Sequence, residues 1–192
     1  MCPTLTAEPT ALSGVVILTP PRFRDSRGVF SECWNRRDMA RLGIEVDFVQ
    51  DNHSVSHNAG TIRGLHYQSP PHAQAKLVRC GHGRLIDVAV DARRGSATYG
   101  KWVAVELSAD NGKQLLVPAG FLHGFATLEP DTEVLYKCSD YYAPECDGSV
   151  LWNSASLGIN WGLPNEASLS EKDAGAIDFA DFDSPFTLED YP

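Results

Sequence analysis

Short apolar stretches recur along the chain, and Gly, Pro, Asn and Asp separate them. The stretches are rich in β-branched and aromatic residues, which is typical of β-strands. They predict about ten strands, at residues 15–18, 29–34, 48–54, 61–67, 75–80, 84–90, 102–107, 114–117, 121–128 and 133–138. Only residues 36–42 and 170–177 favour a helix, and the second segment begins with a sequence close to a capping box, Ser170-Glu171-Lys172-Asp173.

Length and composition narrow the class of protein. Many short strands, few helices, 16 Gly and 12 Pro in 192 residues predict one all-β domain, either a sandwich, a jelly roll or a small barrel. We expect the β part to span about residues 15–162, and an acidic C-terminal segment with a short helix to span about residues 163–192. The sequence contains neither an apolar run of the ~20 residues that cross a bilayer nor a signal peptide pattern. We therefore expect a cytoplasmic protein without a membrane partner.

The charge is unevenly distributed. The formal net charge is −9, and residues 166–192 carry −7 of it. An acidic protein is a poor partner for nucleic acid, whose phosphates bind Lys and Arg, so we expect no nucleic acid partner. Residues 22–94, in contrast, hold 12 basic and 8 acidic residues, a local balance of +4 that can serve an anionic ligand. The five cysteines are widely spaced, which favours reduced thiols.

Four predicted strands carry polar side chains of catalytic type. They contain His66, Lys76, His123 and Tyr136. The strand period of two places Lys76 on one face with Val78 and Cys80. A barrel mouth lined by the four residues would bring together a base, a cation and a proton donor. Each residue also has a structural interpretation: a hydrogen-bonded core histidine, a lysine that reaches the rim, or a core aromatic.

Residues 118–123, PAGFLH, have the Pro-x-Gly-x-x-His form of the second motif of cupin barrels, many of which bind a metal ion. Metal-binding cupins also need a His-x-His pair on another strand and a nearby Glu. The corresponding place here reads His66-Tyr67-Gln68. Two histidines without a third ligand make a weak site, so we expect no metal.

A series of short blocks occurs in a definite order along the chain. The blocks are FRDSRGVFSE at 23–32, QDNHS at 50–54, RGLHYQ at 63–68, KLVR at 76–79, DVAVDAR at 87–93, PAGFLHGF at 118–125, YKCSDYY at 136–142 and LSEKD at 169–173. Together they resemble the dTDP-4-dehydrorhamnose 3,5-epimerase family, from about residue 15 to residue 177. The resemblance implies a cupin-type jelly roll that is usually a homodimer. It also implies a protein without cofactor or metal that acts on a dTDP-4-keto-6-deoxyhexose.

The resemblance also implies catalytic roles. His66 matches the general base of the family, and Asp173 matches the carboxylate that orients it. Lys76 would stand beside the C4 oxygen of the sugar, where it would stabilise an enolate. Tyr136 matches the proton donor on the opposite face of the sugar. Removal of a proton from one face and its return to the other inverts the carbon.

The remaining matches concern substrate binding. Arg27 and Arg63 match phosphate-binding positions, where the guanidinium suits bidentate contact with a diphosphate. Other positions match contacts to the sugar and the nucleotide: Glu32, Gln50, Asp51, Asn52, His123, Tyr142, Asp147 and Lys172. At position 147 this chain has Asp where better-known members have Glu, and the shorter carboxylate could still bind through water.

Arg63 and His66 conflict with strict strand alternation. They are three positions apart, so a regular strand would direct their side chains to opposite faces. Both can face one pocket if Gly64 permits a β-bulge, or if Arg63 lies where the strand begins. The structural alternative for Arg63 is a surface salt bridge.

The leading hypothesis is epimerisation of dTDP-4-dehydro-6-deoxy-D-glucose at C3 and C5 to dTDP-4-dehydro-L-rhamnose, in dTDP-rhamnose biosynthesis. One alternative is an epimerase that inverts only one of the two carbons. Others are a non-catalytic cupin that binds sugar nucleotides and a metal-dependent cupin. If a strand is exchanged between the subunits of a dimer, Arg27 would lie across the interface.

Overall fold

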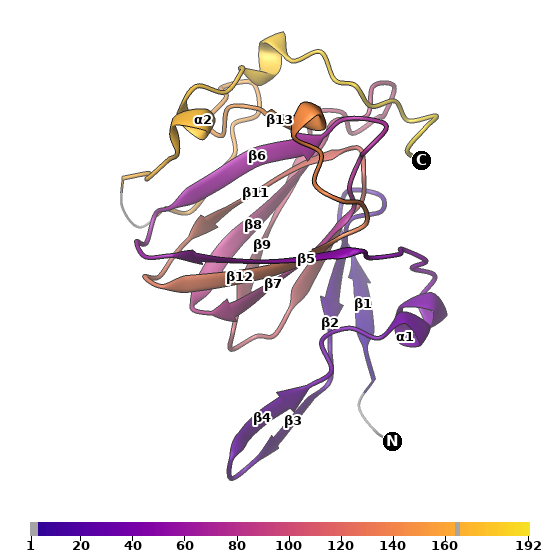
Figure 1. Ribbon diagram of the computed structural model, residues 1–192, viewed down its shortest axis with the longest axis vertical. Coiled ribbons are helices and arrows are strands. Elements are labelled where there is room, and N and C mark those ends of the chain that lie inside the picture. Colours follow the sequence, from indigo (N-terminus) through magenta and orange to yellow (C-terminus); the bar gives the residue numbers. More distant parts are fainter. Residues whose placement is uncertain (1–3, 164–165) are drawn as a thin grey trace.

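Two antiparallel sheets face each other in the computed structural model, which describes residues 4–163 and 166–192 (Figure 1). The six-stranded sheet has the order β1 (Thr6–Pro9), β2 (Val16–Thr19), β10 (Gln114–Val117), β7 (Lys76–His82), β12 (Thr132–Cys138) and β5 (Gln50–Ser56). The five-stranded sheet has the order β13 (Asp147–Ser149), β6 (Ile62–Gln68), β11 (Phe121–Thr127), β8 (Arg84–Asp91) and β9 (Trp102–Ser108). The expectation of an all-β protein is confirmed.

The smaller elements lie outside this pair of sheets. Strands β3 (Arg22–Asp25) and β4 (Gly28–Ser31) form a hairpin that extends away from the barrel (Figure 1). The helices are α1 (Arg36–Arg41) and α2 (Glu171–Ala174), and two 3-10 turns cover Pro144–Cys146 and Phe179–Asp181. None of the described helices is long and apolar enough to cross a lipid bilayer.

Alternation along the strands divides the apolar residues among three clusters. On β8, for example, Leu85 and Ala89 face the space between the sheets, whereas Val88 and Val90 face outward. The outward cluster is covered by the chain after β13, including Trp161. A third cluster on the outer face of the six-stranded sheet packs around Met39 of α1 and includes Leu18, Leu77 and Leu116. The acidic C-terminal segment is therefore a packed layer of the protein.

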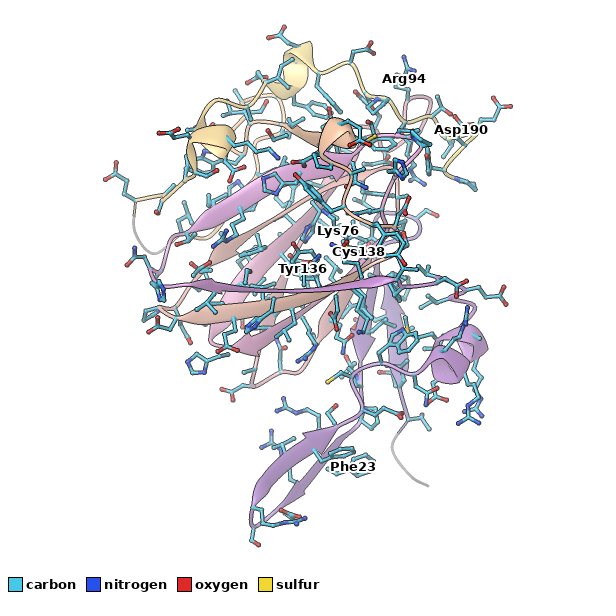
Figure 2. All side chains as sticks on the ribbon, in the orientation of Figure 1. Phe23, Lys76, Arg94, Tyr136, Cys138 and Asp190 are labelled. Atoms are coloured by element: carbon cyan, nitrogen blue, oxygen red, sulfur yellow. The ribbon has the colours of Figure 1, made fainter. Side chains whose placement is uncertain are left out.

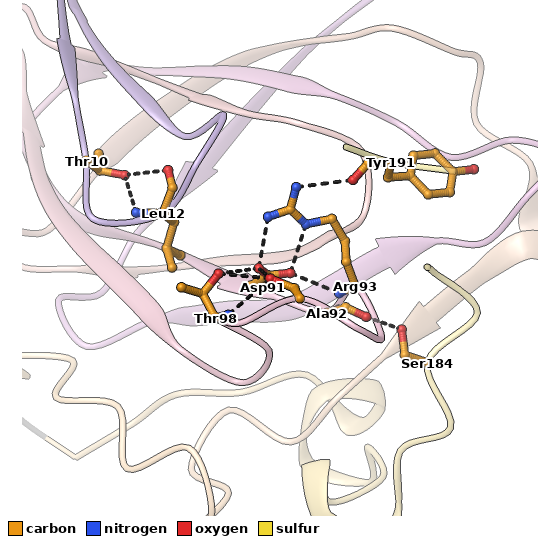
Figure 3. A network of polar contacts seen from close by, with 9 residues as sticks. Thr10, Leu12, Asp91, Ala92, Arg93, Thr98, Ser184 and Tyr191 are labelled. Carbon is orange, nitrogen blue, oxygen red and sulfur yellow. Dashed lines mark hydrogen bonds and ion pairs between the residues drawn. The ribbon is translucent and has the colours of Figure 1, made fainter. Parts of the chain in front are cut away.

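A buried ion pair joins this C-terminal layer to the barrel (Figure 3). The Arg93 guanidinium donates to both carboxylate oxygens of Asp91, at 3.0 and 2.9 Å, and to the backbone carbonyl of Tyr191 at 3.1 Å. The Ser184 hydroxyl donates to the carbonyl of Ala92. Both members of the ion pair are almost fully buried, so each charge needs the other as its partner.

Every strand predicted from the apolar pattern is present, and β1, β3 and β13 are additional. The additional strands were missed because they are short and polar, and β1 and most of β3 are exposed, so no apolar alternation marks them. Helix α1 agrees with the predicted segment 36–42, whereas α2 ends at Ala174, short of residue 177. The predicted cap is present, because the backbone N–H of Asp173 donates to the Ser170 hydroxyl at 3.1 Å.

A β-bulge on β6 brings Arg63 and His66 to the same face. His66 is opposite His123 and Arg63 is opposite Phe125, so two residues of β6 stand where β11 has only Gly124. Gly64 has a φ of +127°, and a Cβ built there would lie 2.6 Å from the Cα of Gly124. Only glycine accommodates that backbone and that distance. The conflict with strict alternation is resolved by the bulge expected at Gly64.

Gly64→Ala is expected to lower the free energy of unfolding by roughly 3 kcal/mol or more, since it adds a backbone clash to an unfavourable φ. The matched control is Gly43→Ala, where φ is also positive, +77°, but nothing lies within 4 Å of the added Cβ. The control should cost only ~1–2 kcal/mol. Urea unfolding of both variants measures the difference, and equal losses would contradict the account of the bulge.

Candidate active site

A cavity of about 410 Å³ opens between the two sheets near β5, β6 and the chain that follows β12. Its walls are polar and aromatic, which suits a charged ligand with a flat or ring-shaped part. The lining residues are Gln50, Asn52, His66, Tyr67, Gln68, Gln74, Lys76, Tyr136, Cys138, Tyr142, Asp147 and Lys172. Eight of the residues expected from the sequence are thus brought together.

The His66 imidazole on β6 is held by a buried carboxylate. Its Nε2 lies 2.6 Å from Oδ1 of Asp173 on α2, and the His66 side chain is 31% exposed. Burial alone would raise the pKa of Asp173, but hydrogen bonds from His66, Ser170 and the Gly64 backbone outweigh it and lower the pKa. Asp173 is therefore ionised and accepts a hydrogen bond from the Nε2–H group of His66. That arrangement leaves the lone pair of Nδ1 for a ligand proton.

Lys76 and Tyr136 project from the facing sheet (Figure 2). Lys76 is opposite Cys138 in the pairing of β7 with β12, and Tyr136 is opposite Val78, so these side chains share the inner face. Burial raises the pKa of the Tyr136 phenol, which keeps its proton at neutral pH. Burial lowers the pKa of the Lys76 ammonium. A proton donor and the Lys76 amino group therefore face the His66 imidazole across the cavity.

His123 lies behind the cavity wall. It is opposite His66 in the pairing of β11 with β6, and its Nε2 is 2.8 Å from Oδ1 of Asp87. Both side chains are buried. His123 thus lies beneath the cavity wall, next to His66.

The rim of the cavity is a connected polar network. Asp147 accepts hydrogen bonds at Oδ2 from the Tyr142 hydroxyl at 3.2 Å and from the Lys172 ammonium at 2.5 Å. The Tyr142 backbone N–H donates to Gln50, and the Gln50 amide donates to Asn52. The shorter carboxylate at 147 therefore still reaches both neighbours directly.

Besides His123, four expected binding residues do not line the cavity. Asp51 faces the outer side of β5, where it pairs with Lys137 at 2.9 Å, because its neighbours Gln50 and Asn52 face inward. Arg27 and Glu32 belong to the projecting hairpin and the chain just after it. Arg63 is at the edge of the inner face, within 3.4 Å of the Ser56 hydroxyl and the Val55 carbonyl. Its interpretation as a surface salt bridge is not supported, since no ion pair of Arg63 occurs among the described residues.

Residues 9–181 match the family profile described as dTDP-4-dehydrorhamnose 3,5-epimerase. The match covers most of the chain, including every strand of the site. The chain belongs to the dTDP-4-dehydrorhamnose 3,5-epimerase family. The expected family, isomerase class and cupin-type jelly roll are thereby confirmed.

Relatives within the dTDP-4-dehydrorhamnose 3,5-epimerase family resemble this chain over nearly its full length. The Salmonella typhimurium enzyme is 50% identical over 168 residues, which are 87% of this chain and 91% of the relative. The Legionella pneumophila enzyme, solved in complex with dTDP-4-keto-L-rhamnose, has a TM-score of 0.89 and 41% identity, and covers 98% and 97% of the two chains. A 3'-monoepimerase from Streptomyces bikiniensis, in complex with dTDP-quinovose, has a TM-score of 0.83 and 35% identity, with 90% and 87% covered.

Several residues of this site in the epimerase were not predicted from the sequence. Gln68 is buried and its amide holds the 139–143 segment through the Tyr141 carbonyl at 3.0 Å and the Ala143 N–H at 3.0 Å. Cys138 lines the cavity, and strand alternation from Tyr136 is the signal that could have found it. Asp87 was also missed as a residue of the site, and its carboxylate contacts His123.

Proposed function

We propose that the chain epimerises dTDP-4-dehydro-6-deoxy-D-glucose at C3 and C5 to dTDP-4-dehydro-L-rhamnose, in dTDP-rhamnose biosynthesis. One observation carries the proposal: a carboxylate-held histidine and a buried phenol face each other from the two sheets of one cavity. A sugar ring bound between them presents one face to His66 and the other to Tyr136. That is the arrangement that inversion of a carbon requires.

The chemistry begins with a C–H bond beside the C4 ketone. Nδ1 of His66 takes the proton, the electron pair moves into the carbonyl, and the Lys76 ammonium stabilises the enolate oxygen. The Tyr136 phenol then gives its proton to the opposite face of the same carbon. Proton exchange with solvent restores the imidazole and the phenol. Because the ketone holds the electron pair throughout, the reaction is balanced without a redox cofactor.

We also propose that the site works without a metal ion. His66 and His123 each direct Nε2 at a carboxylate, at 2.6 and 2.8 Å. Among the described residues, no three His, Cys, Asp or Glu side chains are grouped so as to hold a metal ion. Lys76 supplies the positive charge that a metal would otherwise bring to the enolate oxygen.

The nucleotide part of the substrate is assigned to the rim. Gln50 and Asn52 offer amide groups for a pyrimidine base, and Tyr142 offers an exposed ring. Arg63, at the edge of the inner face, and Lys172, at the rim, are assigned as the cations for the diphosphate. This assignment places the sugar deep in the cavity and the charged groups nearer to solvent.

We propose a homodimer in which the β3–β4 hairpin of one subunit reaches the cavity of its partner. The hairpin exposes Phe23, Val29 and Phe30, the last at 70% of its surface. Phe23 and Phe30 are paired across the hairpin, and Val29 lies on its other face, so exposed apolar side chains on this projecting hairpin indicate a covered surface. The Arg27 side chain at its tip is 87% exposed, so a guanidinium is presented away from its own barrel. In the dimer Arg27 would contact the substrate diphosphate and Glu32 would lie beside it.

The second candidate function is that of an epimerase that inverts only one of the two carbons. The similarity in fold to the Streptomyces bikiniensis 3'-monoepimerase, with a TM-score of 0.83, shows that this architecture also occurs in such an enzyme. Both functions use the same base and donor. They differ in whether the second carbon comes within reach of His66.

Incubation with substrate in D2O is expected to place deuterium at both C3 and C5, as counted by NMR. Deuterium at one carbon would identify the single-carbon epimerase, and none at either would contradict both candidates. His66→Asn should reduce exchange about 10²–10⁴-fold, because the asparagine amide cannot take up the proton that the imidazole accepts. Calorimetric binding of dTDP to His66→Asn is the control for an intact pocket, and binding without any exchange by the wild-type chain would indicate a non-catalytic cupin.

The dimer proposal predicts that two inactive variants restore each other. A mixture of Arg27→Ala and His66→Asn, unfolded together and refolded at equal concentration, should recover about a quarter of wild-type activity, since half of the dimers then contain one complete site. Each variant refolded alone is the control. If the mixture stays as inactive as its parents, then Arg27 does not act across subunits.

A further inference from the structure

Asp87 is a fully buried carboxylate with one oxygen unused. It lies on β8 with 0% of its side chain exposed, between Leu85 and Ala89 on the inner face. Its Oδ1 is 2.8 Å from Nε2 of His123, whereas Oδ2 is buried without a hydrogen-bond partner among the described residues. A buried carboxylate oxygen without a partner is costly, and such an atom requires an explanation.

Lys76 has the complementary problem. Its ammonium projects from β7 into the same interior, and no carboxylate lies within 4 Å of it in the described part of the chain. Burial lowers its pKa, while Cys138, Asp87 and Asp147 oppose that change and Lys172 adds to it. The enolate oxygen needs a cation, so the protein must keep this lysine protonated against its surroundings.

The other charges near Lys76 are already committed. Asp147 is bound by Lys172 and Tyr142 at the rim. Burial raises the pKa of the Cys138 thiol, which keeps it neutral. His66 is held by Asp173 and the Tyr136 phenol is protonated. Asp87 therefore remains as the buried anion with an available oxygen.

We propose that Asp87 is a positioning residue for catalysis: clamped by His123 through Oδ1, it presents Oδ2 to the interior as the counter-charge that keeps Lys76 protonated and directed at the substrate ketone. The role of His123 is then to fix the orientation of Asp87. The proposal rests on the proposed function for its kinetic consequence only. The protonation of Lys76 can be measured without any substrate.

The rival interpretation limits Asp87 to holding His123 in place. In that case the carboxylate matters for packing, and its loss would reduce activity equally at every pH. If Asp87 instead supports the Lys76 cation, its loss changes the pH at which the lysine loses its proton. The two interpretations therefore differ in a pH profile.

The test is Asp87→Asn, which removes the charge and keeps the shape. The Cε resonances of the five lysines are followed by NMR with ¹³Cε-labelled lysine, and Lys76→Met assigns the Lys76 signal. The pKa of Lys76 should fall by about one unit in the variant, because an opposite charge that favours the ammonium has been removed. The alkaline limb of kcat should move to lower pH by the same amount. An unchanged pKa of Lys76 would overturn the proposal.

The matched control is Asp91→Asn. Asp91 lies on the same strand and is equally buried, but it pairs with Arg93 at 2.9 Å. The Asp91→Asn variant should lose stability without a change in the pKa of Lys76. If both variants lower that pKa alike, the effect is a general loss of packing and the proposal fails. A wild-type chain without epimerase activity would refute the proposed function, whereas the NMR arm would still decide the role of Asp87.

Where Asp87→Asn folds, a double-mutant cycle with Lys76→Met tests the coupling independently of the pH profile. The double variant removes both charges, and its loss of free energy of unfolding, measured by urea unfolding, should be smaller than the sum of the losses of the two single variants. Where Asp87→Asn alone is unfolded, Lys76→Met with Asp87→Asn is expected to fold. Strict additivity, or a double variant that is also unfolded, would contradict a coupling between the two side chains.

Discussion

A backbone contact between two glycines determines how the site is built. Gly64 on β6 lies against Gly124 on β11, and the bulge that this contact permits directs Arg63 and His66 to one face. The Gly64 backbone also contributes a hydrogen bond to Asp173, the carboxylate that holds His66. The same irregularity thus places the base, orients its partner and sets the edge of the cavity.

The second constraint is the burial of charge between two sheets. A low dielectric strengthens the interaction of Lys76 with an enolate, but it also disfavours the cation in the absence of substrate. The pKa of Lys76 is lowered and that of Tyr136 is raised, so burial acts in opposite directions on the two groups. A counter-charge at Asp87 reconciles the burial of Lys76 with a protonated lysine. An acidic protein can therefore hold a cationic group in its binding pocket.

Strand alternation predicts much of this site from the sequence. It places Lys76 with Val78 on the inner face, and the same rule applied to Gln50, Asp51 and Asn52 puts Asp51 outside the cavity. What alternation cannot predict is long-range contact and irregular backbone. Asp173 is 107 positions from His66, and no local pattern pairs them. The projecting hairpin was missed in part because β3 is charged and exposed, so no core face marks it.

The central claim is that the base and the proton donor act from separate sheets on opposite faces of the sugar. The most direct measurement is a Tyr136→Phe reaction in D2O, followed by NMR for both deuterium content and configuration. The account predicts that His66 still exchanges the proton with solvent deuterium, while the carbon keeps its configuration because nothing protonates the other face. Inversion at the wild-type rate, or the loss of exchange together with inversion, would contradict it.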